Sequence, residues 1–191
     1  MASYSQIYDE VFSNHTGYQS PIGSPGFRLC LQNQKRIQQL GQKSLDYGCG
    51  AGFTVELLRS HLFQKEAFGA DISPKMVAAG NARIGMDAVK VISNGRAPYE
   101  DNSFDFITCF DVLEHLDEAD ILNVEKEFRR LIKPGGTVFC NISLRLAGSV
   151  DLDGRNLHRT VQAPDWWDKI FAFDEFTVEK SDMEMTGWKR M

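Results

Sequence analysis

Three glycines alternate with other residues in the stretch SLDYGCGAGF, which runs from Ser44 to Phe53. They are Gly48, Gly50 and Gly52, and they follow an apolar run typical of a strand and precede helical periodicity. Glycine loses more backbone freedom on folding than other residues, so such a cluster needs a reason. Bare backbone at the carboxyl end of a strand lets a ligand lie directly on the turn, facing helix N–H groups. The pattern therefore predicts a ligand site.

A carboxylate follows at Asp71, at the end of the next apolar run. Two hydrogen bonds from a ribose diol can be accepted by a carboxylate in this place, whichever nucleoside carries the ribose. The fingerprint of dinucleotide-binding proteins is GxGxxG, whereas this chain reads GxGxG with Phe53 at the third dinucleotide position. Asp71 thus indicates an adenosine-like ligand, and the glycine spacing disfavours a nicotinamide dinucleotide.

The elements that must position these residues are strands alternating with helices. Predicted strands cover 43–47, 66–71, 88–92, 104–110 and 137–144, and predicted helices cover 26–40, 53–64, a stretch beginning at 74, and 120–132. This alternation predicts an α/β fold, a Rossmann-like, doubly wound and mostly parallel sheet with helices on both faces. After residue 144 we expect a long polar loop over 145–160, a short helix over 164–173, and antiparallel edge strands at 176–180 and in the C-terminal tail.

Composition narrows the class of protein. The 191 residues carry a net charge of −5, which argues against a general attraction to nucleic acid or anionic lipid. The four cysteines, Cys30, Cys49, Cys109 and Cys140, are far apart and show no metal-ligand spacing, so we expect free thiols and no metal site. The sequence shows no signal peptide and no apolar run of the roughly 18 residues that a membrane span needs. These features predict a cytoplasmic protein.

Four segments resemble a known family in their order and spacing. DYGCGAG is similar to the DxGxGxG motif of class I S-adenosylmethionine-dependent methyltransferases, and GADISPKM, APYEDNSFDFITCFDVLEHL and LIKPGGTVF resemble later motifs of that family. The resemblance covers 43–144 and implies S-adenosylmethionine as the cofactor. It further implies one methyltransferase domain over 1–191, with a lid segment at 1–23 and an acceptor side at 145–191.

The resemblance also implies which residues contact the cofactor. The methionine portion would lie above Asp46, on the turn that contains Gly48 and Gly50, called the glycine turn below. The diol would lie on Asp71 and the adenine beside Ile72. Many relatives place an acid after the third strand; this chain has Asn94, whose amide oxygen can accept the same hydrogen bond. The expected cofactor-binding residues are Asp46, Gly48, Cys49, Gly50, Gly52, Asp71, Ile72, Met76, Asn94, Gly95, Phe110, Asp111 and His115.

The methyl acceptor is indicated mainly by motifs that the chain lacks. Signatures of adenine-N6, cytosine-C5 and arginine methyltransferases are missing, so we expect methylation of O or N on a small molecule, no DNA partner, and possible homodimerisation. A protein or RNA methyltransferase, a non-catalytic cofactor-binding scaffold and a nicotinamide-dependent dehydrogenase are the alternatives.

His158, in the polar loop, is the predicted catalytic base. The competing interpretation is that His158 forms a hydrogen bond with the backbone of its own loop and holds that loop closed.

Overall fold

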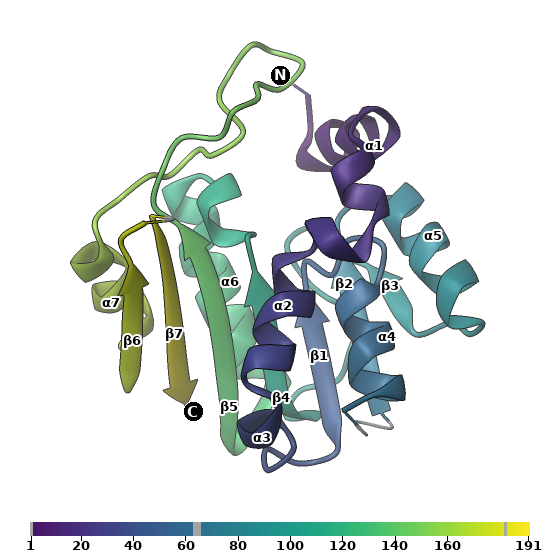
Figure 1. Ribbon diagram of the computed structural model, residues 1–191, viewed down its shortest axis with the longest axis vertical. Coiled ribbons are helices and arrows are strands. Elements are labelled where there is room, and N and C mark those ends of the chain that lie inside the picture. Colours follow the sequence, from purple (N-terminus) through teal and green to yellow (C-terminus); the bar gives the residue numbers. More distant parts are fainter. Residues whose placement is uncertain (1, 63–65, 182) are drawn as a thin grey trace.

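The computed structural model describes residues 2–62, 66–181 and 183–191. Within these residues a single sheet of seven strands has the order β3-β2-β1-β4-β5-β7-β6 (Figure 1). The strands are β1 (Lys43–Tyr47), β2 (Glu66–Asp71), β3 (Val89–Val91), β4 (Phe104–Phe110), β5 (Ile132–Ser143), β6 (Glu175–Glu179) and β7 (Glu184–Arg190). The first five are mutually parallel where they pair, and β7 runs antiparallel to both β5 and β6. The predicted Rossmann-like architecture is confirmed.

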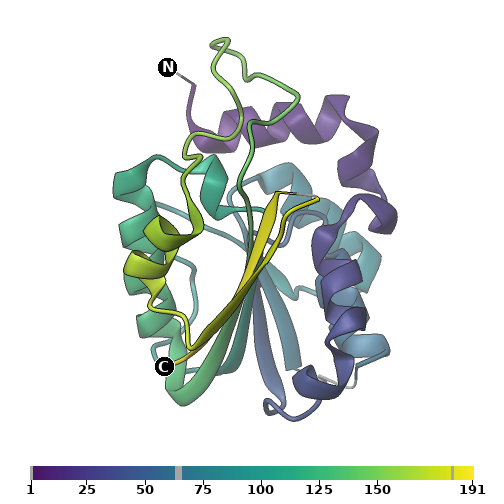
Figure 2. The same ribbon diagram turned by 60° about the vertical axis from the view of Figure 1, so that its left-hand side comes forward.

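Helices cover both faces of the sheet (Figures 1 and 2). The α-helices are α1 (Tyr4–Asn14), α2 (Pro25–Gln32), α3 (Gln34–Ile37), α4 (Phe53–Ser60), α5 (Pro74–Ile84), α6 (Glu118–Leu131) and α7 (Pro164–Phe171), and short 3-10 turns η1 (Thr16–Gln19), η2 (Pro21–Gly23) and η3 (Leu113–His115) join them. Side chains of α2 and α4 pack in one apolar cluster, and those of α6 and α7 pack in another. Burial of apolar side chains on both faces is what a parallel sheet requires.

Several predicted boundaries are wrong, and each has a local cause. The helix expected over 26–40 is interrupted at Asn33, whose side-chain amide donates to the carbonyl of Leu29 at 2.9 Å and so competes with the helix backbone. The fifth strand begins at Ile132, which pairs with Phe104, and the expected turn at 133–136 is an irregularity inside that strand. Only β6 is an edge strand at this end, because β7 lies between β5 and β6.

The first residues of the chain form a helix that sequence periodicity did not predict. Ser3 and Gln6 form a reciprocal capping box at the start of α1, which is a local sequence signature of a helix N-terminus. Figure 2 shows α1 lying across the end of the sheet, beside the loop of residues 145–160. This segment therefore covers the edge at which the parallel strands end.

The four cysteines are free, and all four are buried. Among the described residues, no helix is long and apolar enough to cross a membrane.

Candidate functional site

A cavity of about 610 Å³ lies at the carboxyl ends of β1, β2 and β4. Its walls come from the glycine turn, the end of β2, the residues after β4, α1 and the loop after β5. All predicted site residues line it except Gly52. The strands that end here are parallel, so the cavity lies where ligands bind in open α/β sheets.

Asp46 lies buried beneath the glycine turn. The hydroxyl of Thr108 donates to its Oδ1 at 2.7 Å, which fixes the carboxyl group below the cavity floor. Burial raises the pKa of Asp46 to about 7, although the hydroxyl groups of Thr108 and Thr54 favour the ionised form. Asp46 therefore keeps its proton to a higher pH than an exposed carboxyl group does.

The glycine turn uses backbone conformations that side chains rarely adopt. Gly48 and Gly50 have φ values of +76° and +53°. A Cβ at Gly48 would come within 2.2 Å of Val112 Cγ2, whereas a Cβ at Gly50 would meet only Met76 Sδ, at 3.7 Å. Because Gly48 has no side chain, it leaves space for the side chain of Val112. Gly50 presents bare backbone beside the cavity.

Gly52 has a different role from the one predicted. It is the N-cap of α4 with φ +77°, and a Cβ there would approach the Cα of Gly80 at 3.2 Å. Gly52 thus permits close packing of α4 against α5 behind the cavity. The glycine pattern in the sequence could not separate this packing role from ligand contact.

The Asp71 carboxylate organises two loops at once. Its Oδ2 accepts from the Gly50 amide at 2.7 Å and its Oδ1 accepts from the Ser73 amide at 2.9 Å. Burial raises the pKa of Asp71 to about 6, and the backbone hydrogen bonds oppose that rise. The Ile72 amide acts on the same carboxylate, and an ionised carboxylate has about four acceptor positions, so Asp71 can still accept a hydrogen bond from a ligand.

The side of the cavity beyond Asp71 is formed by two loops. Ile72 is half-buried and Met76 is fully covered, while Asn94 and Gly95 form an exposed turn in which both residues have positive φ. Met76 lies in the first turn of α5, so its side chain is directed by that helix. This arrangement puts apolar surface and the Asn94 side chain at the position where the resemblance places the adenine.

Phe110 and Asp111 end β4. The Phe110 ring packs edge-on against Phe139 with centroids 5.0 Å apart. Asp111 has φ +50° and accepts a hydrogen bond from the Asn141 side-chain amide. Burial and the nearby Glu184 raise the pKa of Asp111 to about 6, and the hydrogen bond from Asn141 opposes this.

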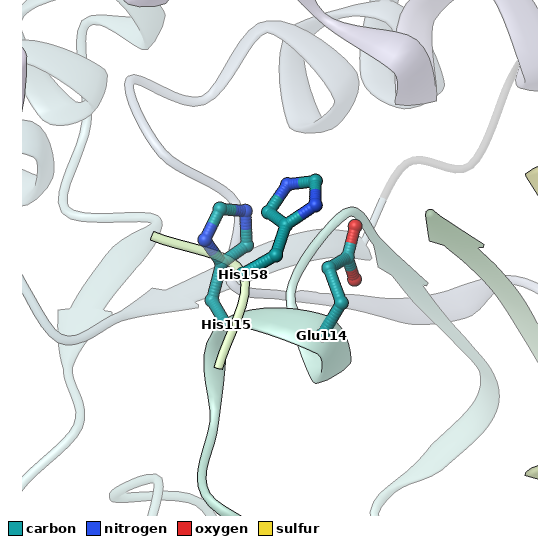
Figure 3. Close-up of side chains that lie close together, drawn as sticks. All are labelled: Glu114, His115 and His158. Carbon is teal, nitrogen blue, oxygen red and sulfur yellow. The ribbon is translucent and has the colours of Figure 1, made fainter. Parts of the chain in front are cut away.

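Beyond Asp111, η3 and the loop after β5 bring Glu114, His115 and His158 together (Figure 3). The rings of His115 and His158 meet edge to face with centroids 4.7 Å apart. His158 Nδ1 lies 2.5 Å from the carbonyl oxygen of Arg145, which is the contact within its own loop that the competing interpretation foresaw. Burial lowers the pKa of both imidazoles, that of His115 to about 3.

The N-terminal helix closes the cavity, and its contacts were missed in the sequence. The Tyr8 ring packs edge-on against His115 with centroids 5.7 Å apart. Asp9 Oδ1 accepts from the Ser73 hydroxyl at 2.5 Å and from the Lys75 amide at 3.1 Å, so it caps α5. At the start of α1, the Tyr4 hydroxyl accepts from the Asp117 amide at 3.0 Å. The capping box at Ser3 was the available signal for this helix.

Comparisons with known proteins agree with this geometry. Residues 45–140 match the methyltransferase domain family. A demethylmenaquinone methyltransferase of Bacillus mycoides (strain KBAB4) is 36% identical over 142 residues, which cover 70% of this chain and 59% of that protein. The chain spans about 60% of the length of the curated relatives it matches.

Solved structures share the fold. A Pyrococcus horikoshii OT3 protein aligns with a TM-score of 0.72 and 18% identity, covering 95% of this chain and 98% of that one. A SAM-dependent methyltransferase from Aquifex aeolicus aligns with a TM-score of 0.62 and 21% identity, covering 90% and 98% respectively. The family match, the cavity at the strand ends and the fold shared with these structures agree. The chain belongs to the class I S-adenosylmethionine-dependent methyltransferases.

Proposed function

We propose that this protein transfers the methyl group of S-adenosylmethionine to an oxygen or nitrogen of a small-molecule acceptor. The observation that carries the proposal is a single continuous cavity with two kinds of wall. One wall is the glycine turn and Asp71, and the other is the loop after β5, including Arg145 and His158. One cavity can therefore bring a cofactor and an acceptor into contact.

The residues present fit the cofactor. Bare backbone at Gly50 leaves room for the methionine portion to approach, since a Cβ there would point into open space beside Met76. The Asp71 carboxylate, with its remaining acceptor positions, suits a ribose diol. The chemistry that the bound cofactor supplies is a methyl group already activated on a sulfonium.

The protein itself must align the acceptor with the methyl group of the cofactor. Transfer requires an acceptor lone pair held in line behind the methyl group, and positioning alone can lower such barriers substantially. Tyr8 and the loop around His158 line the cavity beside the space for the acceptor. An amine acceptor only has to arrive neutral, whereas a hydroxyl acceptor must also lose a proton.

The cavity size and the relatives support a small-molecule acceptor. The curated relatives carry the name demethylmenaquinone methyltransferase, so a quinone-type ring is the first acceptor class to test. The alternative, a protein or RNA acceptor, would need a docking surface outside the cavity. Cytoplasmic location and homodimer formation stay predictions, checked by cell fractionation and by light scattering.

The test has two stages. Calorimetry should detect S-adenosylmethionine and S-adenosylhomocysteine binding and no NAD binding. The protein is then incubated with methyl-labelled cofactor and, in turn, reduced quinones, a metabolite extract, and cellular protein or RNA. Label in a small-molecule fraction supports the proposal. Label only in macromolecules would contradict the acceptor class, and cofactor binding without any transfer would favour a scaffold.

A further inference from the structure

Glu114, His115 and His158 form a compact cluster on the acceptor side of the cavity. One ligand atom from each residue lies within 4.8 Å of the other two. Figure 3 shows Glu114 and His115 rising from the same 3-10 turn and His158 reaching the same space from the loop after β5. Two imidazoles and a carboxylate are a frequent ligand set for divalent first-row metals.

The backbone contacts of both histidines fix which ring nitrogen can bind a metal ion. His115 Nδ1 lies 3.0 Å from the Leu157 carbonyl and His158 Nδ1 lies 2.5 Å from the Arg145 carbonyl. A carbonyl oxygen only accepts, so each Nδ1 carries the hydrogen and each Nε2 carries a free lone pair. Backbone carbonyls in this role are the usual outer partners of metal-binding histidines.

Glu114 supplies the second, independent observation. Its side chain is fully buried, and its Oε1 accepts from the Ser143 amide at 3.0 Å. Its Oε2 has no hydrogen-bond partner among the described residues. A buried carboxyl oxygen without a partner is unusual in a folded protein and calls for an explanation.

Charged side chains of both signs act on the cluster. Asp111 and Glu184 both act on Glu114 with negative charge. Arg159, the cation that acts on His115, is paired with Asp151 in a buried ion pair. Arg145 acts on His158 with positive charge as well, so carboxylates and cations both surround the cluster.

We propose that Glu114, His115 and His158 bind a divalent transition-metal cation that holds and activates a hydroxyl of the methyl acceptor. The predicted absence of a metal site rested on cysteine spacing, and the three ligands here are separated by up to 44 positions, so no local motif reveals them. At bond lengths of about 2.0–2.1 Å, neighbouring ligand atoms in a tetrahedral site lie ~3.3 Å apart. Binding must therefore draw the three side chains together by small rotations.

The proposal rests on the proposed function and specifies its acceptor: a molecule whose hydroxyl, phenolic or enolic oxygen can ligate the cation. Coordination lowers the pKa of that hydroxyl, as it does for metal-bound water, and the proton leaves to solvent. The oxygen then attacks the methyl carbon, an O–C bond forms, and the C–S bond breaks with its electron pair remaining on sulfur. In this scheme His158 is a ligand, which replaces its predicted role as the base.

The test uses the full chain, freed of metal by a chelator and titrated with Zn²⁺ in a calorimeter. One ion per chain should bind. Glu114→Gln and His158→Ala should each weaken binding by more than about 100-fold, since loss of even an outer-shell partner costs about 10- to 100-fold. Glu114→Gln is nearly isosteric and retains an oxygen that can accept from the Ser143 amide. This variant therefore still tests the metal site if His158→Ala does not fold. Co²⁺ in place of Zn²⁺ should give a visible absorption band that Glu114→Gln removes.

The matched control is His61→Ala, which removes an exposed imidazole outside the cavity and should leave Zn²⁺ affinity unchanged. Failure of the wild type to bind Zn²⁺, or equal binding by the wild type and both cluster variants, would overturn the metal site. S-adenosylhomocysteine affinity is measured on the same samples. Retained cofactor binding without a metal site would leave the proposed function standing, whereas loss of cofactor binding in the wild type would contradict that function itself.

Discussion

The Gly50 amide donates a 2.7 Å hydrogen bond to the carboxylate of Asp71, which lies 21 positions further along the chain. This bond ties the loop after β1 to the end of β2 in the floor of the cavity. Asp71 therefore shapes the glycine turn before any ligand arrives. Its substitution tests both the shape of the turn and the contact with the cofactor.

Asp71→Asn should weaken S-adenosylhomocysteine binding by about 1.5–3 kcal/mol, as expected for hydrogen bonds to a charged group. The amide keeps one oxygen and nearly the same shape, so the fold should survive. Calorimetry gives the affinity, and Asp87→Asn, at an exposed site, is the control. Unchanged affinity in Asp71→Asn would refute the diol assignment.

Gly50→Val should abolish cofactor binding in a folded protein. Valine at φ +53° strains the backbone by about 1–2 kcal/mol, and its side chain would occupy space beside the cavity. Gly85→Val is the matched control, because Gly85 has φ +76°, nothing within 4 Å of its Cβ position, and no place in the cavity wall. Both variants should lose similar stability on thermal unfolding, and only Gly50→Val should lose binding. Normal binding by Gly50→Val would show that the ligand does not approach this turn.

The contribution of Asp46 to the stability of the ligand-free protein should fall as pH rises from about 4 to about 7. Asp46 ionises at pH 3.8 in the unfolded chain and at about 7 in the folded one, mainly because it is buried. The folded state therefore holds the proton more tightly, and the stabilisation present below pH 3.8 is lost as pH rises through 7. At about 1.4 kcal/mol per pKa unit, the loss from Asp46 is on the order of 3–4 kcal/mol.

Urea unfolding at a series of pH values measures this slope. Asp46→Asn cannot ionise, so its unfolding free energy should vary less over the same window. The remaining slope should come in part from Asp71, whose pKa is also raised by burial. An identical pH profile in wild type and Asp46→Asn would contradict the assignment.

Asp9→Ala should loosen α1 from the start of α5. It removes the acceptor for the Ser73 hydroxyl and the Lys75 amide, and loss of a cap of this kind costs about 1 kcal/mol. Limited proteolysis within residues 2–23 should accelerate about fivefold, and S-adenosylhomocysteine should dissociate faster. Glu10→Ala, next in the chain and exposed, should change neither rate. If Asp9→Ala were cleaved as slowly as the wild type within residues 2–23, the contacts of Asp9 would not be what holds α1 in place.

The parts of the site that are local in sequence could be predicted. Residues at the ends of β1, β2 and β4 line the cavity because parallel strands with apolar periodicity bring their carboxyl ends to one edge. Each of these inferences depends on one strand and the turn that follows it.

The parts that depend on long-range packing could not be predicted. His158 meets His115 only because a loop without regular structure folds back over η3, and no sequence period encodes that path. The α1 helix was missed because its apolar residues, Ile7 and Val11, cover a loop and not the sheet, which gives a weak stripe. Gly52 was assigned to the ligand because a packing glycine and a ligand-contacting glycine look alike in a motif.

The two contacts that hold α1 bear on the order of events in a catalytic cycle. Tyr4 fastens one end beside the start of α6 and Asp9 fastens the middle beside the start of α5, with the cavity between. A segment fastened twice swings only after one contact breaks, and the other then acts as its hinge. If Asp9 is released first, the cofactor half of the cavity opens while Tyr4 still covers the acceptor half. The two substrates would then exchange through separate openings, so spent cofactor could leave without the acceptor side being exposed to water.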